Sequence, residues 1–385
     1  MSRRPAAMVA AGILLSRILG LVRQRALAHF LGNSGVADAF TAAFRIPNLL
    51  QNLFGEGALS ASFIPVYAGL LADDARAEAD RVAGAIGALL ALVVAGIVVV
   101  GVLTSPFLVT VIAPGFSGDK RELTIHLVRI LFPGAGLLVL SAWCLGVLNS
   151  HRRFFLSYAA PVAWNLAIIG TLLVLGPRRG MADLAVAAAW ASVAGSLLQV
   201  LVQWPTVRRV APGLRFRLAT TALHVRTVLR NFVPAFVGRG VVQVSAFIDS
   251  LLATLLPTGA VAAIGYAQTI YLMPVSLFGM AISAAELPAM SGARGTAGEV
   301  QAYLRARLDG GLRRVAFLVV PSAMAFLALG HVIVSALFQT GEFGRRDSMY
   351  VWGILAGSAV GLLASTMGRL YASAFYALRD ARTPL

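Results

Sequence analysis

Long apolar runs separated by short polar segments dominate the chain. A helix needs about 20 apolar residues to cross the hydrocarbon core of a bilayer, and the run from Ala83 to Leu103 contains no charged residue. The pattern predicts an all-α fold, a polytopic transmembrane helical bundle with about ten spans. The predicted spans are residues 6–31, 37–71, 83–112, 124–148, 158–176, 182–204, 231–256, 260–290, 313–338 and 349–378.

The composition agrees with a membrane-embedded bundle. The chain has 385 residues, of which 58% are hydrophobic and 12% are charged, whereas a soluble domain carries about 25% charged residues. Arg3 and Arg4 precede an apolar stretch, as in a signal peptide. Three arginines interrupt that stretch and further spans follow, so we expect an uncleaved first span.

The net charge is +16, and Lys120 is the only lysine. In a soluble protein this balance would suggest a nucleic-acid partner, but cytoplasmic loops of membrane proteins also collect basic residues. With a cytoplasmic N-terminus, nineteen basic residues lie in inside segments and six in outside loops. We therefore expect that orientation and no nucleic-acid partner. Segment 206–230, with six arginines, is interpreted as a basic cytoplasmic connector, amphipathic and lying on the membrane surface.

Several short motifs recur along the chain at one nearly constant offset. This predicts two pseudo-symmetric lobes of six helices, the second incomplete. The lobes would be an N-terminal lobe over 1–205 and a C-terminal lobe over 231–385. Counterparts of the fifth and sixth spans would then follow Leu385; the alternative is a natural ten-span protein. The recurring pairs are Leu53-Phe54-Gly55 with Leu277-Phe278-Gly279, Pro65 with Pro288, and Gly136-Leu137-Leu138 with Gly361-Leu362-Leu363.

Polar residues inside the second span share one helical face. Charged groups at mid-bilayer usually face a water-filled cavity or a partner, and the spacing of seven, seven and four residues favours one face or its edge. We interpret the stripe as cavity lining, and intra-bundle ion pairing, such as Asp38 with an arginine of the first span, is the alternative. Pro47 and the glycines beside Glu56 are expected to bend or break this helix. The stripe consists of Asp38, Arg45, Asn48, Asn52 and Glu56.

Other spans carry further candidates. Arg17 and Arg23 on the first span could hold a substrate anion, because guanidinium is a permanent cation that can bind phosphate through two hydrogen bonds. Arg17 lies deeper in the span and is the better candidate, and for Arg23 the alternative is snorkelling at the outer end. On the seventh and eighth spans the candidates are Arg239, Gln243 and Gln268. Asp38, Glu56, Asp249 and Glu286 could couple ions, although pairs of Arg239 with Asp249 or Glu286 would be purely structural.

Signatures of soluble enzymes are absent from the sequence. Lys120 does not stand in a phosphate-binding loop of the Walker type, and the five histidines do not form a metal-type pair on one helix. We therefore expect a transporter and not an enzyme, with no cofactor.

The motifs together resemble one family. The quoted stretches are Ser16-Arg17-Ile18-Leu19-Gly20-Leu21-Val22-Arg23, Ala37-Asp38-Ala39-Phe40, Arg45-Ile46-Pro47-Asn48-Leu49-Leu50, Phe54-Gly55-Glu56-Gly57-Ala58, Phe63-Ile64-Pro65, Ala113-Pro114-Gly115-Phe116 and 375–384. This combination resembles the MurJ/MviN family of the MOP exporter superfamily, over essentially the whole chain.

The resemblance implies a fold of about fourteen helices and a flippase for lipid II, the undecaprenyl-diphosphate-linked peptidoglycan precursor. Arg17, Arg23 and Asp38 match the family's cavity residues, and Glu56 falls on its pattern. The sequence departs from the family at Gln51 and Asn52, where basic residues are common, and at Thr269, where a cavity arginine is expected. Arg239 could supply that charge instead.

The expected function is translocation of lipid II across the bacterial cytoplasmic membrane by alternating access, driven by an ion gradient or the membrane potential. Lipid II, membrane lipids and cell-wall synthesis proteins are the expected partners. The alternatives are an exporter of another lipid-linked oligosaccharide or a small molecule, and a non-transporting scaffold of the cell-wall synthesis complex.

Overall fold

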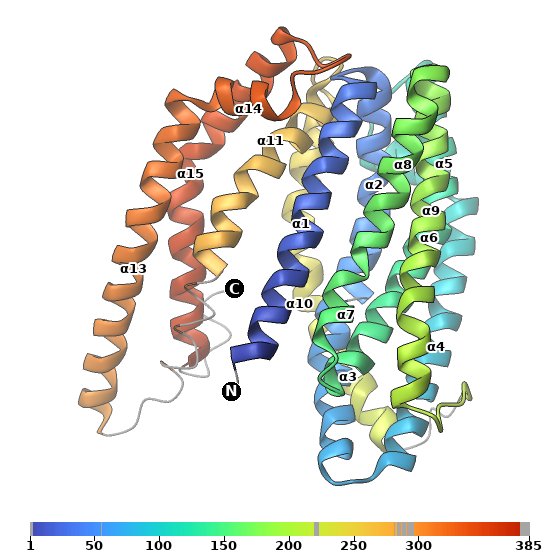
Figure 1. The fold of residues 1–385 in the computed structure, drawn as a ribbon, viewed down its shortest axis with the longest axis vertical. Coiled ribbons are helices and arrows are strands. Elements are labelled where there is room, and N and C mark those ends of the chain that lie inside the picture. Colours follow the sequence, from blue (N-terminus) through green and yellow to red (C-terminus); the bar gives the residue numbers. More distant parts are fainter. Residues whose placement is uncertain are drawn as a thin grey trace. The chain divides into compact units, whose positions relative to one another are not determined.

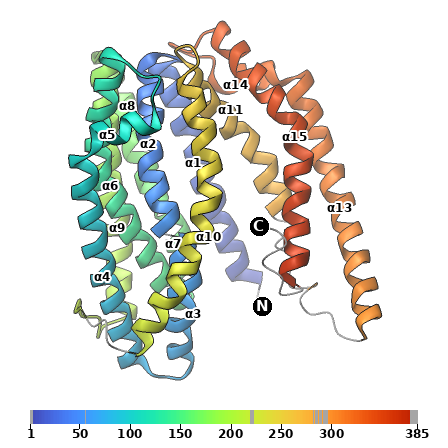
Figure 2. The ribbon, with the colours of Figure 1, turned by 180° about the vertical axis from the view of Figure 1, so that it is seen from behind.

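A computed structural model describes residues 3–54, 56–218, 223–280, 282, 286, 290 and 296–377. Every regular element in these ranges is a helix (Figures 1 and 2). By internal contacts the chain divides into two compact units, Met1–Ala262 and Ala263–Leu385. The all-α prediction is confirmed, whereas the predicted lobe boundary at the connector stays a prediction.

The first unit contains the helices that follow from the first seven apolar runs. Three of the runs, 37–71, 83–112 and 158–176, are each divided between two α-helices. The helices are α1 (Arg3–Leu31), α2 (Gly35–Phe54), α3 (Glu56–Ala72), α4 (Arg76–Leu103), α5 (Ser105–Ile112), α6 (Gly118–Ser150), α7 (Phe154–Ala159), α8 (Pro161–Leu175), the short 3₁₀ helix η1 (Gly176–Arg178), α9 (Met181–Val210) and α10 (Leu223–Thr254).

The second unit continues from α11 (Ala260–Pro274), whose first residues belong to the first unit. A π-helical turn, η2 (Val275–Met280), follows and contains the recurring triplet Leu277-Phe278-Gly279. The unit then contains α13 (Ala297–Ala328), α14 (Gly330–Phe338) and α15 (Arg345–Ala377). Gly55, where the sequence predicts a bend, lies outside the described residues, and α2 is helical across Pro47.

Eight segments of the described chain are long and apolar enough to cross a membrane. Helices α1 and α10, counted as spans in the sequence analysis, are not among them. Both are long helices, of 29 and 32 residues, but they carry several arginines each. The eight segments are Gly35–Ala72, Arg76–Leu103, Gly118–Ser150, Phe154–Arg178, Met181–Val210, Ala260–Phe278, Gly298–Phe338 and Arg345–Ala372.

Helix α6 lies at the centre of the first unit and packs against α2, α3, α4 and α9, while α8 packs against α1 and α9 (Figure 1). The small and apolar residues of α6 are buried over most of the length of that helix. A core of buried side chains from α3, α4 and α6 includes Phe63, Tyr67 and Trp143. This packing makes α6 and its neighbours a fixed wall for the polar site described below.

Of the predicted connector, residues 206–210 belong to α9 and residues 223–230 to α10, and residues 211–218 between them form no regular element. The backbone N–H of Gly213 donates to Asp80 Oδ2 at 2.8 Å. The ring of Phe216 lies with its centroid 5.8 Å from those of two tryptophans, Trp143 and Trp204. The segment is therefore tied to α4, α6 and α9, and its arginines lie at the surface.

The two halves repeat a bent helix followed by a long one. The chain bends at Thr104 (φ −91°, ψ 8°) between α4 and α5, and at Leu329 (φ −116°, ψ 5°) between α13 and α14. The two bends are separated along the chain by the same offset as Gly136 and Gly361 in the sequence motifs. Helices α6 and α15, which follow the bends, have 33 residues each. The repeat predicted from sequence is thus present in the backbone.

Candidate functional site

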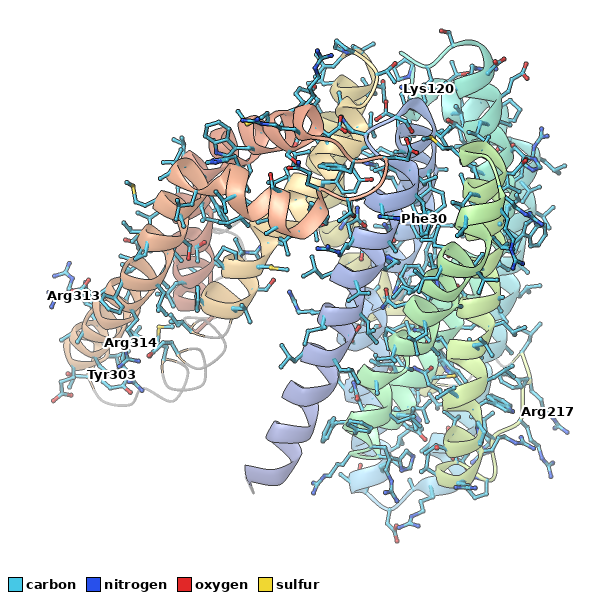
Figure 3. The ribbon with its side chains drawn as sticks, turned by 45° about the horizontal axis from the view of Figure 1, so that its top comes forward. Phe30, Lys120, Arg217, Tyr303, Arg313 and Arg314 are labelled. Carbon is cyan, nitrogen blue, oxygen red and sulfur yellow. The ribbon has the colours of Figure 1, made fainter. Side chains whose placement is uncertain are left out.

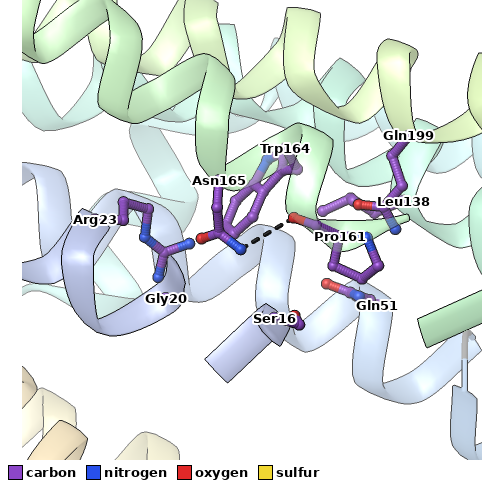
Figure 4. Close-up of a pocket in the computed structure, with 9 residues that line it drawn as sticks. All are labelled: Ser16, Gly20, Arg23, Gln51, Leu138, Pro161, Trp164, Asn165 and Gln199. Carbon is purple, nitrogen blue, oxygen red and sulfur yellow. Dashed lines mark hydrogen bonds between the residues drawn. The ribbon is translucent and has the colours of Figure 1, made fainter. Parts of the chain in front are cut away.

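A polar pocket of about 210 Å³ lies inside the first unit, between α1, α2, α6, α8 and α9 (Figure 4). It combines one cation with amide, hydroxyl and indole groups, which is an unusual content for the interior of an apolar bundle. A polar hollow of this kind is where a membrane protein can hold a polar ligand. The lining residues are Ser16, Gly20, Arg23, Gln51, Leu138, Pro161, Trp164, Asn165 and Gln199.

Arg23 supplies the charge of this pocket. Its guanidinium carbon lies 4.5 Å from the centre of the Trp164 ring, a distance typical of a cation–π contact. Its Nε is buried and has no hydrogen-bond partner among the described residues. Because a buried donor without a partner is costly, this atom is suited to an acceptor that the chain does not supply. Arg23 thus contacts the bundle at Trp164 and the pocket, which differs from a side chain that snorkels away from its span.

Buried amides form the side of the pocket that faces α8 and α9. Asn165 Nδ2 donates to the carbonyl oxygen of Pro161 at 3.0 Å. Gln199 Nε2 donates to Ser141 Oγ at 2.8 Å, and Ser141 Oγ donates to Gln203 Oε1 at 3.0 Å. These bonds fix the orientation of the amides, so the pocket has a pre-organised neutral side opposite its cation.

The other candidates on α1 and α2 do not line this pocket. Arg17 is exposed, Arg45 is half-buried, and Asn48 and Asn52 are exposed. Gln51, which the sequence analysis noted only as a departure from the family, does line it. The side chain of Glu56 lies outside the described residues. The proposed roles of these residues stay predictions.

Candidates further along the chain are not gathered at the pocket either. The side chain of Arg239 lies outside the described residues. Gln243 is half-buried, and Asp249 and Gln268 are exposed. Thr269 donates its hydroxyl to the carbonyl oxygen of Gly265 at 2.9 Å, which is a bond within its own helix. A replacement of the family's arginine by Arg239 therefore stays a prediction.

Asp38 forms a buried junction at the beginning of α2. Its Oδ2 accepts from Lys120 Nζ at 2.6 Å and from the backbone N–H of Gly259 at 2.7 Å, and its Oδ1 accepts from the N–H of Ala262 at 2.8 Å. The side chain is 1% exposed. The ion-pairing alternative describes these contacts, with Lys120 as the partner in place of an arginine of the first span.

Glu286 forms a second buried carboxylate, in the second unit. Its oxygens lie 3.2 Å from Arg314 Nη1 and 3.5 Å from Arg307 Nε, both on α13. Glu286 is thus paired with arginines that the sequence analysis assigned to the cytoplasmic side.

Sequence reasoning missed Trp164, Asn165 and Gln199. Single polar residues within the fifth and sixth predicted spans were the available signal, but their partners come from other helices. Among the described residues, no group of three or more His, Cys, Asp or Glu side chains could hold a metal ion.

Solved structures with the same fold are membrane transporters. A lipid II flippase MurJ in an inward closed conformation aligns with a TM-score of 0.83 at 22% identity, over 98% of this chain and 77% of the other. A multidrug resistance MATE family transporter of the MOP superfamily, in an inward-facing conformation, aligns with a TM-score of 0.79 at 15% identity, over 96% of this chain and 82% of the other. The chain therefore has the same fold as these two proteins.

Comparisons of the sequence identify the family. Residues 27–385 match the family described as lipid II flippase MurJ. The lipid II flippase MurJ of Burkholderia cenocepacia is 34% identical over 97% of this chain and 72% of its own length. The chain belongs to the MurJ family, and the family places it in the bacterial inner membrane.

Proposed function

We propose that this protein translocates lipid II from the cytoplasmic to the outer leaflet of the bacterial inner membrane, as part of peptidoglycan synthesis. Membership of the MurJ family supports the substrate. The observation that carries the proposal within this chain is the buried Nε of Arg23, which has no partner among the described residues and faces a polar pocket in a membrane-spanning bundle.

The chemistry of the substrate explains why such a pocket is needed. A diphosphate joined to sugars cannot enter hydrocarbon without losing its hydration, and the transfer of an ionised group costs far more than a protein can leave uncompensated. A guanidinium can replace part of the hydration with charge-assisted hydrogen bonds. Arg23 would hold the diphosphate, Arg17 would attract it, and the undecaprenyl chain would remain in lipid.

The distribution of charge supports one orientation in the membrane. In the first unit, Lys120 and Arg217 lie at opposite ends of the bundle (Figure 3). The excess of arginines on the connector side supports a cytoplasmic position for that end and for the N-terminus. The membrane potential, worth about 2.3 kcal/mol per elementary charge per 100 mV, or an ion gradient would drive alternating access. The protein would act as a transporter without catalysis, and cell-wall synthesis proteins stay predicted partners.

The test replaces the cell's own flippase with variants of this protein. Cells depleted of that flippase would express the wild type, Arg23→Ala or Arg178→Ala, and lipid II in the outer leaflet would be measured together with protein abundance in the membrane. Arg178 is an exposed arginine of the same unit and is the matched control.

We expect the wild type and Arg178→Ala to restore translocation, and Arg23→Ala to abolish it at normal abundance. Restoration by Arg23→Ala would favour a scaffold. A wild type that reaches the membrane but does not restore lipid II translocation would refute the proposed substrate and favour another exported compound.

A further inference from the structure

The buried amide Asn165 presents an unused acceptor to the pocket. Asn165 is 3% exposed, and its Nδ2 donates to the Pro161 carbonyl oxygen. A carbonyl oxygen can accept hydrogen bonds but cannot donate them. This bond fixes which end of the amide is the oxygen. Oδ1 is therefore the atom that remains, and it is buried without a partner among the described residues. An acceptor held in this position calls for an O–H or N–H group from outside the chain.

The neighbouring amide is held in the same way. Gln199 is 6% exposed and lines the pocket. Its Nε2 is committed to Ser141, and Ser141 in turn donates to Gln203. Because the relay uses one of the two N–H groups of Gln199, this amide is held in place by α6. The α8–α9 side of the pocket is thus neutral and fixed by hydrogen bonds.

The two unused groups define a complementary ligand. Arg23 Nε needs an acceptor, and Asn165 Oδ1 needs a donor, and both belong to one pocket. A ligand that satisfies both carries an anionic group beside a hydroxyl or an amide N–H. The volume of about 210 Å³ lies below the roughly 300–1,000 Å³ of pockets that hold a whole drug-sized ligand. We therefore assign to it only a part of the substrate, of about one sugar ring.

We propose that this pocket holds the sugar directly attached to the diphosphate of the lipid-linked substrate, with Asn165 Oδ1 accepting a hydrogen bond from a hydroxyl or acetamido N–H of that sugar. The assignment rests on the proposed function, since it places the diphosphate at Arg23. It adds recognition of the sugar by α8, whereas the charge on α1 recognises only the anion.

The test compares two ligands that share the lipid diphosphate and differ in the sugar. Affinities of the purified protein for lipid II and for undecaprenyl diphosphate would be measured for the wild type, Asn165→Leu, Arg23→Gln and Ser196→Ala. Leucine keeps the branching of asparagine at Cγ, with larger methyl groups at the two ends, and removes the acceptor. Ser196 is a fully buried residue of α9 that bonds within its own helix and does not line the pocket, so it controls for a general loss of buried polarity.

We expect the wild type to bind lipid II at least tenfold more tightly than undecaprenyl diphosphate. Asn165→Leu should remove that preference and leave binding of undecaprenyl diphosphate unchanged, while Arg23→Gln should weaken both ligands and Ser196→Ala neither. Equal affinities of the wild type for the two ligands would overturn the sugar assignment, even if Asn165→Leu does not fold. An Asn165→Leu variant that weakens both ligands equally would also overturn it. Failure of Arg23→Gln to weaken either ligand would instead count against the proposed function.

Discussion

Two charged residues of the first unit, the buried Asp38 and the half-buried Arg23, differ in how completely their hydrogen bonds are satisfied. Asp38 accepts from a lysine and from two backbone N–H groups, so both of its oxygens are engaged. Arg23 has an aromatic neighbour but leaves its buried Nε without a partner among the described residues. The hydrogen bonds of Asp38 are satisfied within the chain, whereas those of Arg23 are not satisfied by the described residues.

The difference separates a structural role from a binding role. A buried charge with all its bonds satisfied stabilises the elements that it joins, and removal of one partner of such a pair is strongly destabilising. A buried donor without a partner weakens the fold, and it persists where a ligand or water supplies the partner. The sequence analysis placed both residues in one cavity, but the contacts assign Asp38 to a junction between α2, α6 and the beginning of α11.

The largest expected effect is on stability, from Asp38→Ala. This change leaves Lys120 and two backbone N–H groups without their acceptor, and we expect a loss of about 3–5 kcal/mol in the free energy of unfolding. Unfolding in mixed micelles would measure it. Asp183→Ala, at an exposed position in the first turn of α9, is the control and should change the free energy by no more than about 0.5 kcal/mol. If Asp38→Ala lost no more stability than the control, the structural role assigned to Asp38 would be wrong.

Arg23→Gln should lower ligand affinity and leave stability nearly unchanged. The variant loses the cation–π contact, which is worth about 0.5–2 kcal/mol. It also removes the cost of a partly buried charge whose hydrogen bonds are incomplete, and this gain offsets the loss. The free energy of unfolding should thus stay within about 1 kcal/mol of the wild type. Affinity for undecaprenyl diphosphate should fall roughly tenfold to a hundredfold, since a hydrogen bond to a charged group is worth about 1.5–3 kcal/mol. Severe destabilisation with unchanged affinity would assign Arg23 a structural role.

Lys120→Met should destabilise the protein less than Asp38→Ala. Asp38 would keep its two backbone donors, and the lysine side chain is 20% exposed, so we expect a loss of about 1.5 kcal/mol in the free energy of unfolding. The same unfolding measurement applies. A loss as large as that of Asp38→Ala would mean that the lysine alone satisfies the carboxylate, and that the bonds to Gly259 and Ala262 contribute little.

The sequence predicted the helices and the repeat well, because both depend on local patterns. It also named Arg17 and Arg23, since charges inside an apolar run are visible in a linear sequence, but it favoured Arg17, which is exposed. It did not predict the neutral side of the pocket, because Asn165 and Gln199 become partners of one site only when α8 and α9 pack beside α6. The lysine partner of Asp38 was missed for a similar reason: 82 residues separate them, and Lys120 stands in what the pattern marks as an outside loop.

The paired bends at Thr104 and Leu329 show how the repeat has diverged. Where a helix stops, its last carbonyl oxygens lose their intrahelical partners. At the first bend, hydroxyls of Thr104 and Ser105 donate to carbonyls of α4, and Arg129 donates to Ser105. At the second, the indole of Trp352, which stands close to the position in the repeat that corresponds to Arg129, donates to the carbonyl of Phe326. The two bends therefore meet the same hydrogen-bonding requirement with different side chains, so residue identity alone understates the structural likeness of the two halves.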